Sequence, residues 1–285
     1  MNLLKETYKT LKKDKKILIP FIILAIFEGI ALYLVFLAPQ YPVSKLLAPP
    51  IRKFFGEKAL HYPTNLLMIE QIFQYAMIAL NYLPGIFLNA IVVSFVFKSI
   101  NNNQLLFFKT LLKTIKRFFA LTIIWIAAYY TSKYSSILML NLAHKFEIHK
   151  LASFIAVNNI LTRYYLPNIL IILSLIINFL SQSLFVYSIP LIIIEDKNIF
   201  RAIFENFKYL FKLLIPTTLI FFSGAIIFIP VIILKMNTPH LMKNILMEAP
   251  IYVSSLEILT ILFLNIFITI TTTILYINKR PENEL

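Results

Sequence analysis

Three carboxylic acids lie inside long apolar stretches of the chain, where an ionisable group could bind a proton or a ligand. Glu28 lies in the middle of one stretch, while Glu70 and Glu257 lie near the outer ends of two others. Ionisable groups in membrane spans are costly and indicate function by default, and we expect no Lys or Arg partner within the spans. Glu28 fits a protonated, hydrogen-bonded structural carboxyl and a proton or ligand site equally well. For Glu70 and Glu257, nearness to water favours a structural role.

Rows of amide and hydroxyl side chains accompany these acids on alternate apolar stretches. Because amides that face lipid would lack hydrogen-bond partners, we expect the rows to face the protein interior. Hydrogen bonds between helices would explain them without any function; a polar cavity or groove is the alternative. The candidate intramembrane polar site is Glu28, Glu70, Gln74, Asn81, Asn178, Gln182 and Glu257.

The usual signatures of catalysis and metal binding are missing from the sequence. There is no cysteine, which excludes disulfides, thiolate metal ligands and cysteine nucleophiles. His144 and His149 are five residues apart, whereas two metal ligands on a helix prefer a spacing of four. There is no Gly-rich phosphate loop or nucleophile elbow. We therefore expect no catalytic residues, no metal and no cofactor, and an intramembrane enzyme is the least favoured class.

The composition indicates that these side chains are positioned by membrane-spanning helices. The chain is 59% hydrophobic and only 14% charged, against about 45–50% and about 25% in soluble domains. A span needs about 20 apolar residues. The second and fourth apolar stretches are too long for straight spans, and we expect kinks at Pro84 and Pro190. The six predicted spans are 17–38, 66–97, 118–142, 165–194, 214–235 and 252–277.

The basic residues predict the orientation of these spans. Of the 27 Lys and Arg residues, 17 lie before the first span, between the second and third, between the fourth and fifth, or after the sixth. Lys and Arg mark cytoplasmic loops, which places both termini in the cytoplasm. Because the basic residues flank apolar blocks, the net charge of +14 favours anionic lipid headgroups as partners over nucleic acid. The first apolar run is too long for a signal peptide and is read as a retained span.

The three basic cytoplasmic segments resemble one another. When they are aligned at Leu3, Phe107 and Ile199, apolar residues recur with helical spacing and basic residues recur at the same offsets. We therefore predict one all-α membrane domain, 1–285, built from pseudo-repeats 1–97, 98–194 and 195–285. Each repeat is a helical hairpin preceded by an amphipathic interfacial helix. The lysines and arginines expected to contact lipid headgroups are Lys5, Lys12, Lys109, Lys116, Arg201 and Lys208.

The stretch from Tyr187 to Pro216 also resembles a known family. Pro190 is followed by an aliphatic run, then by Glu195, Ala202 and a basic helix before the next span. This pattern is similar to the six-span membrane domain attached to some bacterial glycerophosphodiester phosphodiesterases, and to related stand-alone, uncharacterised membrane proteins. The resemblance implies a helical bundle in the bacterial inner membrane. It implies no phosphodiesterase activity, because a catalytic barrel has no counterpart in this length. Asn206 stands where that family usually has serine.

The segment 39–64 lies between the first two predicted spans and contains five prolines. Ile51, Phe54, Phe55 and Ala59 form a short apolar stripe within it. This pattern is typical of an interfacial helix on the outer surface. A face that docks a protein partner is the alternative.

These observations favour a non-enzymatic integral membrane protein that binds, organises or helps to move lipid or another amphiphile. Basic interfacial helices next to polar faces on alternate spans would suit that role. One alternative is a structural or assembly subunit of a larger membrane complex. Another is a small-solute or proton-coupled transporter that uses Glu28.

Overall fold

The computed structural model describes residues 3–145 and 159–280, and every regular element in those ranges is helical. This confirms the all-α prediction for the described part of the chain. The elements are α1 (Leu3–Lys13), the 3₁₀ turn η1 (Lys15–Leu18), α2 (Ile19–Leu37), α3 (Ser44–Phe55), the 3₁₀ turn η2 (Glu57–Leu60), α4 (Thr64–Leu80), the π-helical η3 (Asn81–Gly85), α5 (Ile86–Ile100), α6 (Phe107–Lys116), α7 (Phe118–Lys145), α9 (Asn159–Ser183), α10 (Ser188–Ile193), α11 (Ile199–Lys212), α12 (Leu214–Met236), α13 (Thr238–Asn244) and α14 (Ala249–Lys279).

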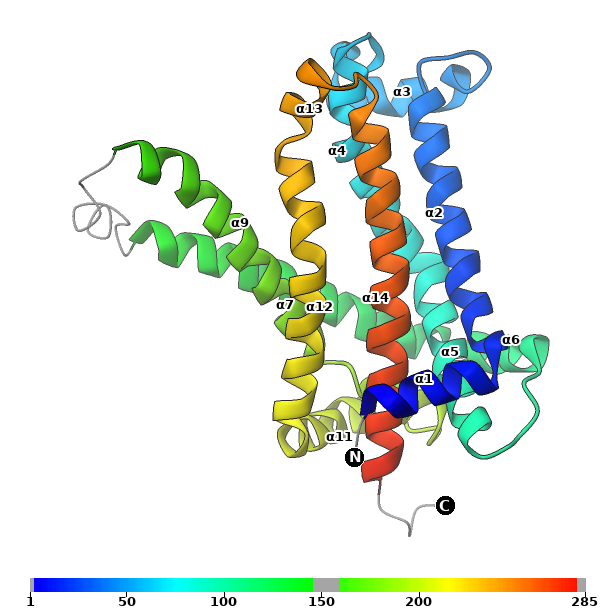
Figure 1. Cartoon of the computed structure of the whole chain (residues 1–285). Coiled ribbons are helices and arrows are strands. Elements are labelled where there is room, and N and C mark those ends of the chain that lie inside the picture. Colours follow the sequence, from blue (N-terminus) through cyan, green and yellow to red (C-terminus); the bar gives the residue numbers. More distant parts are fainter. Residues whose placement is uncertain (1–2, 146–158, 281–285) are drawn as a thin grey trace.

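The long helices form a bundle with distinct ends (Figure 1). Helices α2, α12 and α14 run side by side with the α4–α5 pair, while α7 and α9 form a pair that leans away from them. Helices α1, α6 and α11 lie at one end of the bundle, which we call the basic end, together with the last turns of α14. Helices α3 and α13 lie at the opposite end, which we call the far end.

Four helical segments of the described chain are long and apolar enough to cross a membrane, judged by length and composition. They are Lys15–Leu37, Leu170–Ile193, Leu214–Met236 and Ala249–Lys279. They coincide with the first, fourth, fifth and sixth predicted spans. The other two predicted spans take different forms, because one is divided into α4 and α5 and the other, α7, carries Ser132, Lys133, Ser135 and Ser136 in its middle.

Both expected kink points lie at interruptions of the helices. Pro84 lies within the π-helical η3, between α4 and α5. A proline inside a helix removes a hydrogen-bond donor and clashes with the preceding turn, and a π-bulge is one way to accommodate it. The second interruption falls at 184–187, between α9 and α10, and Pro190 lies in the first turn of α10. There the missing N–H of proline is least costly.

Close packing joins the α7–α9 pair to the rest of the bundle. Helix α9 lies against α12, and a Cβ atom added to Gly224 of α12 would stand only 3.2 Å from the Phe179 ring of α9. A larger residue at this position would require the Phe179 ring to shift. At the basic end, the rings of Tyr187, Tyr209 and Tyr276 pack together with centroids 5.0–6.4 Å apart.

The three predicted amphipathic helices are present as α1, α6 and α11. Their likeness extends to burial, because Thr110 and Thr114 of α6 occupy the same offsets as Ala202 and Asn206 of α11, and all four are buried. The division into three pseudo-repeats stays a prediction. Large apolar side chains at matching offsets are exposed on all three helices, namely Leu4, Phe108 and Phe200 at the first offset and Tyr8, Leu112 and Phe204 at the second.

At the far end, the predicted apolar stripe is divided between the interior and the surface. Ile51 of α3 and Ala59 of η2 are buried against Ala38, and the Phe55 ring packs edge-on against Tyr75 of α4 at 5.6 Å between centroids. Phe54 is instead exposed. The helix therefore packs on the bundle through one edge only.

Candidate functional site

The structure brings the three predicted carboxylates together in the far half of the bundle. Glu28 comes from α2, Glu70 from α4 and Glu257 from α14, three helices that pack against one another. Lys235, in the last turn of α12, lies among them. Its Nζ is 2.9 Å from both carboxylate oxygens of Glu257 and 3.2 Å from Oε1 of Glu70. We call these four residues the carboxylate cluster.

Lys235 corrects the expectation that the intramembrane acids have no basic partner. It follows a run of apolar residues and ends the fifth predicted span, so the sequence alone allows it to be taken for a loop residue. Its side chain is only 8% exposed. The signal that could have identified it is a lysine at the same end of its span as Glu70 and Glu257.

Glu28 differs from the other members of the cluster because it has no ion pair. It is 1% exposed, and its Oε1 has no hydrogen-bond partner among the described residues. It lies close enough to Glu257 for their charges to repel. Three carboxyl groups thus share one ammonium group, and the deepest of the three receives none of its hydrogen bonds.

The prediction that the rows of polar side chains face the protein interior is wrong for Gln74 and Gln182. Gln74 and Gln182 are exposed, and Asn81 donates to the Met77 carbonyl oxygen of its own helix, at 2.9 Å. The buried face of α4 consists instead of Leu66, Ile69, Phe73 and Met77. That apolar face packs against α2 and α14 and turns the glutamines away from the bundle.

Asn178 forms hydrogen bonds between helices, which is one of the two roles considered above for the rows of polar side chains. Its Oδ1 accepts hydrogen bonds from Ser132 at 2.8 Å and from Ser136 at 2.6 Å. Both serines belong to α7, so Asn178 of α9 links the two helices of the leaning pair. Its side-chain hydrogen bonds in the described residues are to α7 and not to the carboxylate cluster.

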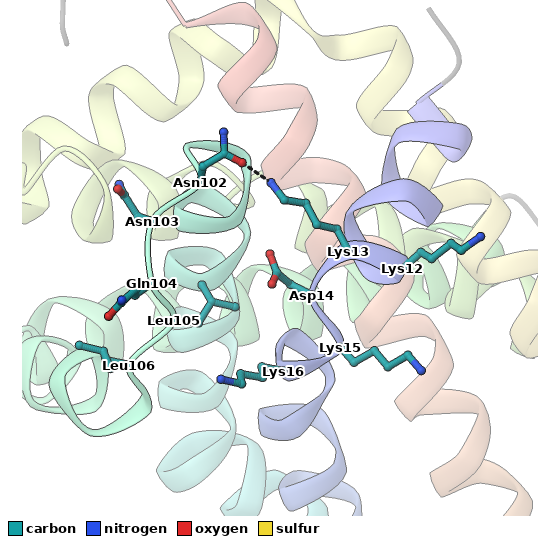
Figure 2. Close-up of a pocket in the computed structure, with 10 residues that line it drawn as sticks. All are labelled: Lys12, Lys13, Asp14, Lys15, Lys16, Asn102, Asn103, Gln104, Leu105 and Leu106. Carbon is teal, nitrogen blue, oxygen red and sulfur yellow. Dashed lines mark hydrogen bonds between the residues drawn. The ribbon is translucent and has the colours of Figure 1, made fainter.

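A groove of about 690 Å³ opens at the basic end between two segments of the chain. One wall is the end of α1 with η1, and the other is the loop between α5 and α6 (Figure 2). We call it the basic groove. It is lined by Lys12, Lys13, Asp14, Lys15, Lys16, Asn102, Asn103, Gln104, Leu105 and Leu106.

The lysines of the basic groove have different roles. Lys13 Nζ donates to the Ser99 carbonyl oxygen and to Asn102 Oδ1, both at 2.6 Å, and so ties the two walls together. Asp14 accepts a hydrogen bond from the Ser99 hydroxyl. Figure 2 shows Lys16 directed toward the loop, with Lys12 and Lys15 extending from the rim. These last three have no polar partner within the described ranges.

All six residues expected to contact headgroups lie exposed on the amphipathic helices. Lys5 and Lys12 are on α1, Lys109 and Lys116 on α6, and Arg201 and Lys208 on α11. Only Lys12 lines the basic groove. Arg201 is partly engaged, because its Nε donates to Glu205 at 2.8 Å.

A second cluster of charges, which we call the basic-end network, joins the α10–α11 loop to the end of α14. The Glu195 carboxylate lies 2.6 Å from Lys197 Nζ and 3.1 Å from Arg280 Nε, and it accepts a hydrogen bond from the Tyr276 hydroxyl. Lys197 also pairs with Glu205, which Arg201 contacts. The network is Glu195, Lys197, Arg201, Glu205, Tyr276 and Arg280.

The pKa shifts in this network follow from its geometry. Burial would lower the pKa of Lys197, but hydrogen bonds to Glu195 and Glu205 outweigh that effect and raise it. Burial would likewise raise the pKa of Glu205, but hydrogen bonds from Lys197 and Arg201 lower it. Both groups are therefore held in their charged forms, because each lies beside partners of opposite charge.

Asn206 of α11 is fully buried. Its Nδ2 donates to the Leu184 carbonyl oxygen at 2.6 Å, and its Oδ1 accepts from the Tyr187 backbone N–H at 3.0 Å. These bonds satisfy backbone groups at the break between α9 and α10, where no helix partner is available. A serine is too short to replace both bonds.

Comparison of the chain with protein-family models, curated proteins and solved structures gives no match. The family resemblance of the Tyr187–Pro216 stretch therefore stays a prediction. Within residues 3–145 and 159–280, no group of three or more His, Asp or Glu side chains is arranged to hold a metal ion. His149, one of the two closely spaced histidines, lies outside the described residues.

Proposed function

We propose that the chain is a six-span protein of the bacterial cytoplasmic membrane that binds anionic lipid at its basic end. Four of the spans are the long apolar segments described above. The proposal adds α4–η3–α5 and α7. Ten of the first twelve residues of α5 are apolar. Helix α7 has 28 residues, so that at 1.5 Å per residue it exceeds the roughly 30 Å of a bilayer core.

The positions of the basic helices support an orientation with both termini in the cytoplasm. Helices α1, α6 and α11 and the last turns of α14 lie at the same end of the bundle (Figure 1). Together with the segments that adjoin them, these elements carry 17 of the 27 lysines and arginines. Because cytoplasmic loops are enriched in Lys and Arg, the basic end is assigned to the cytoplasmic surface.

The observation that carries lipid binding is the shared exposure pattern of the three amphipathic helices. Phe108, Phe200 and Phe204 are each more than three-quarters exposed, although burying such a side chain contributes about 1.5–3 kcal/mol. At matching offsets the same helices expose lysine or arginine. Apolar rows beside basic rows suit the boundary between acyl chains and anionic headgroups.

The basic groove gives the proposal a specific location. Lys16 is directed into it and has no polar partner in the described chain, while Lys12 and Lys15 lie at its rim. An anionic headgroup placed there would meet unpaired ammonium groups and the amides of Asn103 and Gln104. Its acyl chains would lie beside the exposed apolar residues of the neighbouring helices.

Lipid retention by the purified protein tests the proposal. The full chain would be extracted with a mild detergent and measured by native mass spectrometry after addition of equal amounts of an anionic and a zwitterionic phospholipid. We expect selective retention of the anionic lipid, and loss of that selectivity in the triple variant Lys12→Gln, Lys15→Gln, Lys16→Gln. The matched control, Lys45→Gln, Lys53→Gln, Lys58→Gln, removes the same charge at the far end and should retain the selectivity. Equal loss in both variants would contradict a site at the groove.

A role as a subunit of a larger membrane complex is the second candidate, favoured by the surface around α3. Tyr41, Leu46 and Phe54 are all at least three-quarters exposed there. Aromatic residues at this level also suit the second membrane surface. Purification in mild detergent separates the two roles. A stoichiometric protein partner that is lost in the variant Leu46→Ser, Phe54→Ser would support the subunit role, and a chain that purifies alone would count against it.

A further inference from the structure

The carboxylate cluster carries an inference that does not depend on lipid binding. Around Glu28 of α2, the helices packed against it contribute Glu70 from α4 and Glu257 from α14, and Lys235 of α12 pairs with both of these acids. Helix α5 also packs against α2, but its one ionisable residue is Lys98, near the basic end. Glu28 thus faces two further carboxyl groups and a single ammonium group.

The charges of the cluster do not balance. The ammonium of Lys235 is already shared between both oxygens of Glu257 and one oxygen of Glu70. An ionised Glu28 would be a buried charge without a partner, at a cost of several kcal/mol or more. The arrangement is therefore consistent with a proton on Glu28, while Lys235 pairs with Glu70 and Glu257.

A purely structural carboxylic acid would be expected to have hydrogen-bond partners for its buried oxygens. Oε1 of Glu28 is buried and has none in the described chain. A leucine or methionine would fill the same space without an unsatisfied group. Retaining an acid here lowers stability, which is typical of residues kept for function rather than packing.

The exposure of the side chains defines a route from the surface to Glu28. Glu70 is the most exposed of the cluster at 25%, followed by Glu257 at 11% and Lys235 at 8%. Glu28 lies at the inner end, at 1%. The contacts follow the order Glu70, Lys235, Glu257 and Glu28, in which the first two pairs are ion pairs and the last is an electrostatic repulsion.

We propose that Glu28 is a reversible proton-binding site that exchanges with water through Glu70, Lys235 and Glu257. On binding, a proton from hydronium moves to a Glu28 carboxylate oxygen and a water molecule is released. The neutral acid no longer repels Glu257, so Lys235 remains paired with Glu257 and Glu70. On release of the proton, the Glu28 carboxylate competes for Lys235 and weakens those pairs.

Infrared difference spectroscopy tests the proposal directly, because only a protonated carboxyl has the C=O stretching band of an acid. The full chain, reconstituted in nanodiscs of fixed lipid composition, would be measured across a pH series in H₂O and in D₂O. We expect a band that is absent from Glu28→Gln, diminishes reversibly as pH rises, and shifts when H₂O is replaced by D₂O. Glu248→Gln, the same change at an exposed acid of the far end, should leave the band in place.

The same measurement distinguishes a proton-exchange site from its alternatives. A band that neither titrates nor shifts in D₂O while the protein stays folded would identify a static structural acid and overturn the proposal. Equal spectra for the wild type and Glu28→Gln would show that Glu28 carries no proton and would also overturn it.

Glu70→Leu should slow the shift in D₂O, and an unchanged rate would exclude the route through Glu70. Lipid retention by Glu28→Gln should equal that of the wild type. A negative result for proton exchange at Glu28 would therefore not count against lipid binding at the basic end.

Discussion

The carboxylate cluster and the basic-end network both contain buried charges, but their charges are balanced differently. In the network, two carboxylates meet one lysine, two arginines and a tyrosine hydroxyl. In the cluster, three carboxyl groups meet one lysine. A set of buried charges in which each member is paired holds elements together, whereas a set with an unpaired member can exchange a proton or bind a ligand.

The positions of the two sets in the chain agree with this difference. The basic-end network joins residues of a loop, of α11 and of the end of α14, and so fixes how the chain leaves one helix and enters the next. The carboxylate cluster joins side chains of four long helices within the bundle. A rearrangement of its ion pairs would therefore act on the packing of those helices.

Removing the centre of the basic-end network is expected to have the largest effect. Glu195→Leu leaves Lys197, Arg280 and the Tyr276 hydroxyl without their shared acceptor, and its side chain is only 3% exposed. Breaking a buried ion pair on one side costs about 3–5 kcal/mol. The free energy of unfolding, measured in mixed detergent micelles, should fall by about that amount.

Two further variants keep this prediction testable if Glu195→Leu does not fold. Glu195→Gln retains an acceptor and should lose less stability than the leucine variant. Asp196→Asn removes the neighbouring charge, which is half exposed and pairs with Lys113 and Arg117. Exposed ion pairs contribute about 0–1 kcal/mol. A loss of stability in Asp196→Asn as large as that in Glu195→Leu would therefore contradict the special role of the buried Glu195.

In the carboxylate cluster, Lys235→Leu should have the next largest effect. The substitution leaves Glu70 and Glu257 without their ammonium partner, and we expect a loss of about 3 kcal/mol in the free energy of unfolding. The double variant Lys235→Leu, Glu257→Leu should recover most of that loss, because the partly exposed Glu70 can be hydrated. A double variant less stable than Lys235→Leu alone would show that the two residues are not coupled.

The sequence predicts part of this cluster and not the rest. Glu28, Glu70 and Glu257 are recognisable because each is an acid inside an apolar run. Lys235 is not, because it ends a run, and its burial depends on how α12 packs beside α14 and on its ion pair with Glu70 of α4. Likewise the helical period shows which residues share a face with Gln74, but not that apolar residues of α4 occupy the face against the bundle.

The amphipathic helices were more predictable than the site. Their apolar and basic positions follow from local spacing alone, and the helices that form there need no distant partner to be recognised. Asn206 is the opposite case. Its bonds to Leu184 and Tyr187 depend on a break between α9 and α10 that Pro190 indicates only approximately, because the break falls at 184–187. The sequence thus predicts helices from local spacing, but it does not predict which polar groups from distant parts of the chain come into contact.

A smaller effect of opposite sign is expected for Glu28→Leu. Because Glu28 has no ion pair and an unsatisfied buried oxygen, removing it leaves no partner uncompensated. The free energy of unfolding should stay within about 1 kcal/mol of the wild type or rise. Glu257→Leu, which takes a carboxylate from Lys235, should destabilise more. Equal losses in the two variants would mean that Glu28 has a structural partner and that the cluster resembles the network.

The smallest effect expected is a change in the pH dependence of stability that is specific to the basic-end network. Glu205 has a lowered pKa in the folded chain, so its contribution is complete above its ordinary pKa of 4.5 and is lost as pH falls through the folded value. Lys197 has a raised pKa, so its contribution is complete below 10.5 and is lost as pH rises through the folded value. Stability from this pair should therefore be constant at neutral pH and decline in acid and in strong base.

Glu205→Gln isolates the acid side of that profile. The variant should be less stable than the wild type at neutral pH, and the two should converge as pH falls, because the wild-type carboxylate then loses its charge as well. Glu248→Gln, at an exposed acid of the far end, should run parallel to the wild type throughout. Unfolding of all three chains in micelles across the same pH series measures the difference. If the difference in the free energy of unfolding between Glu205→Gln and the wild type stays constant across the pH series, the network is held by hydrogen bonds that do not depend on the charge of Glu205. The balance of charges would then not explain how the basic-end network and the carboxylate cluster differ.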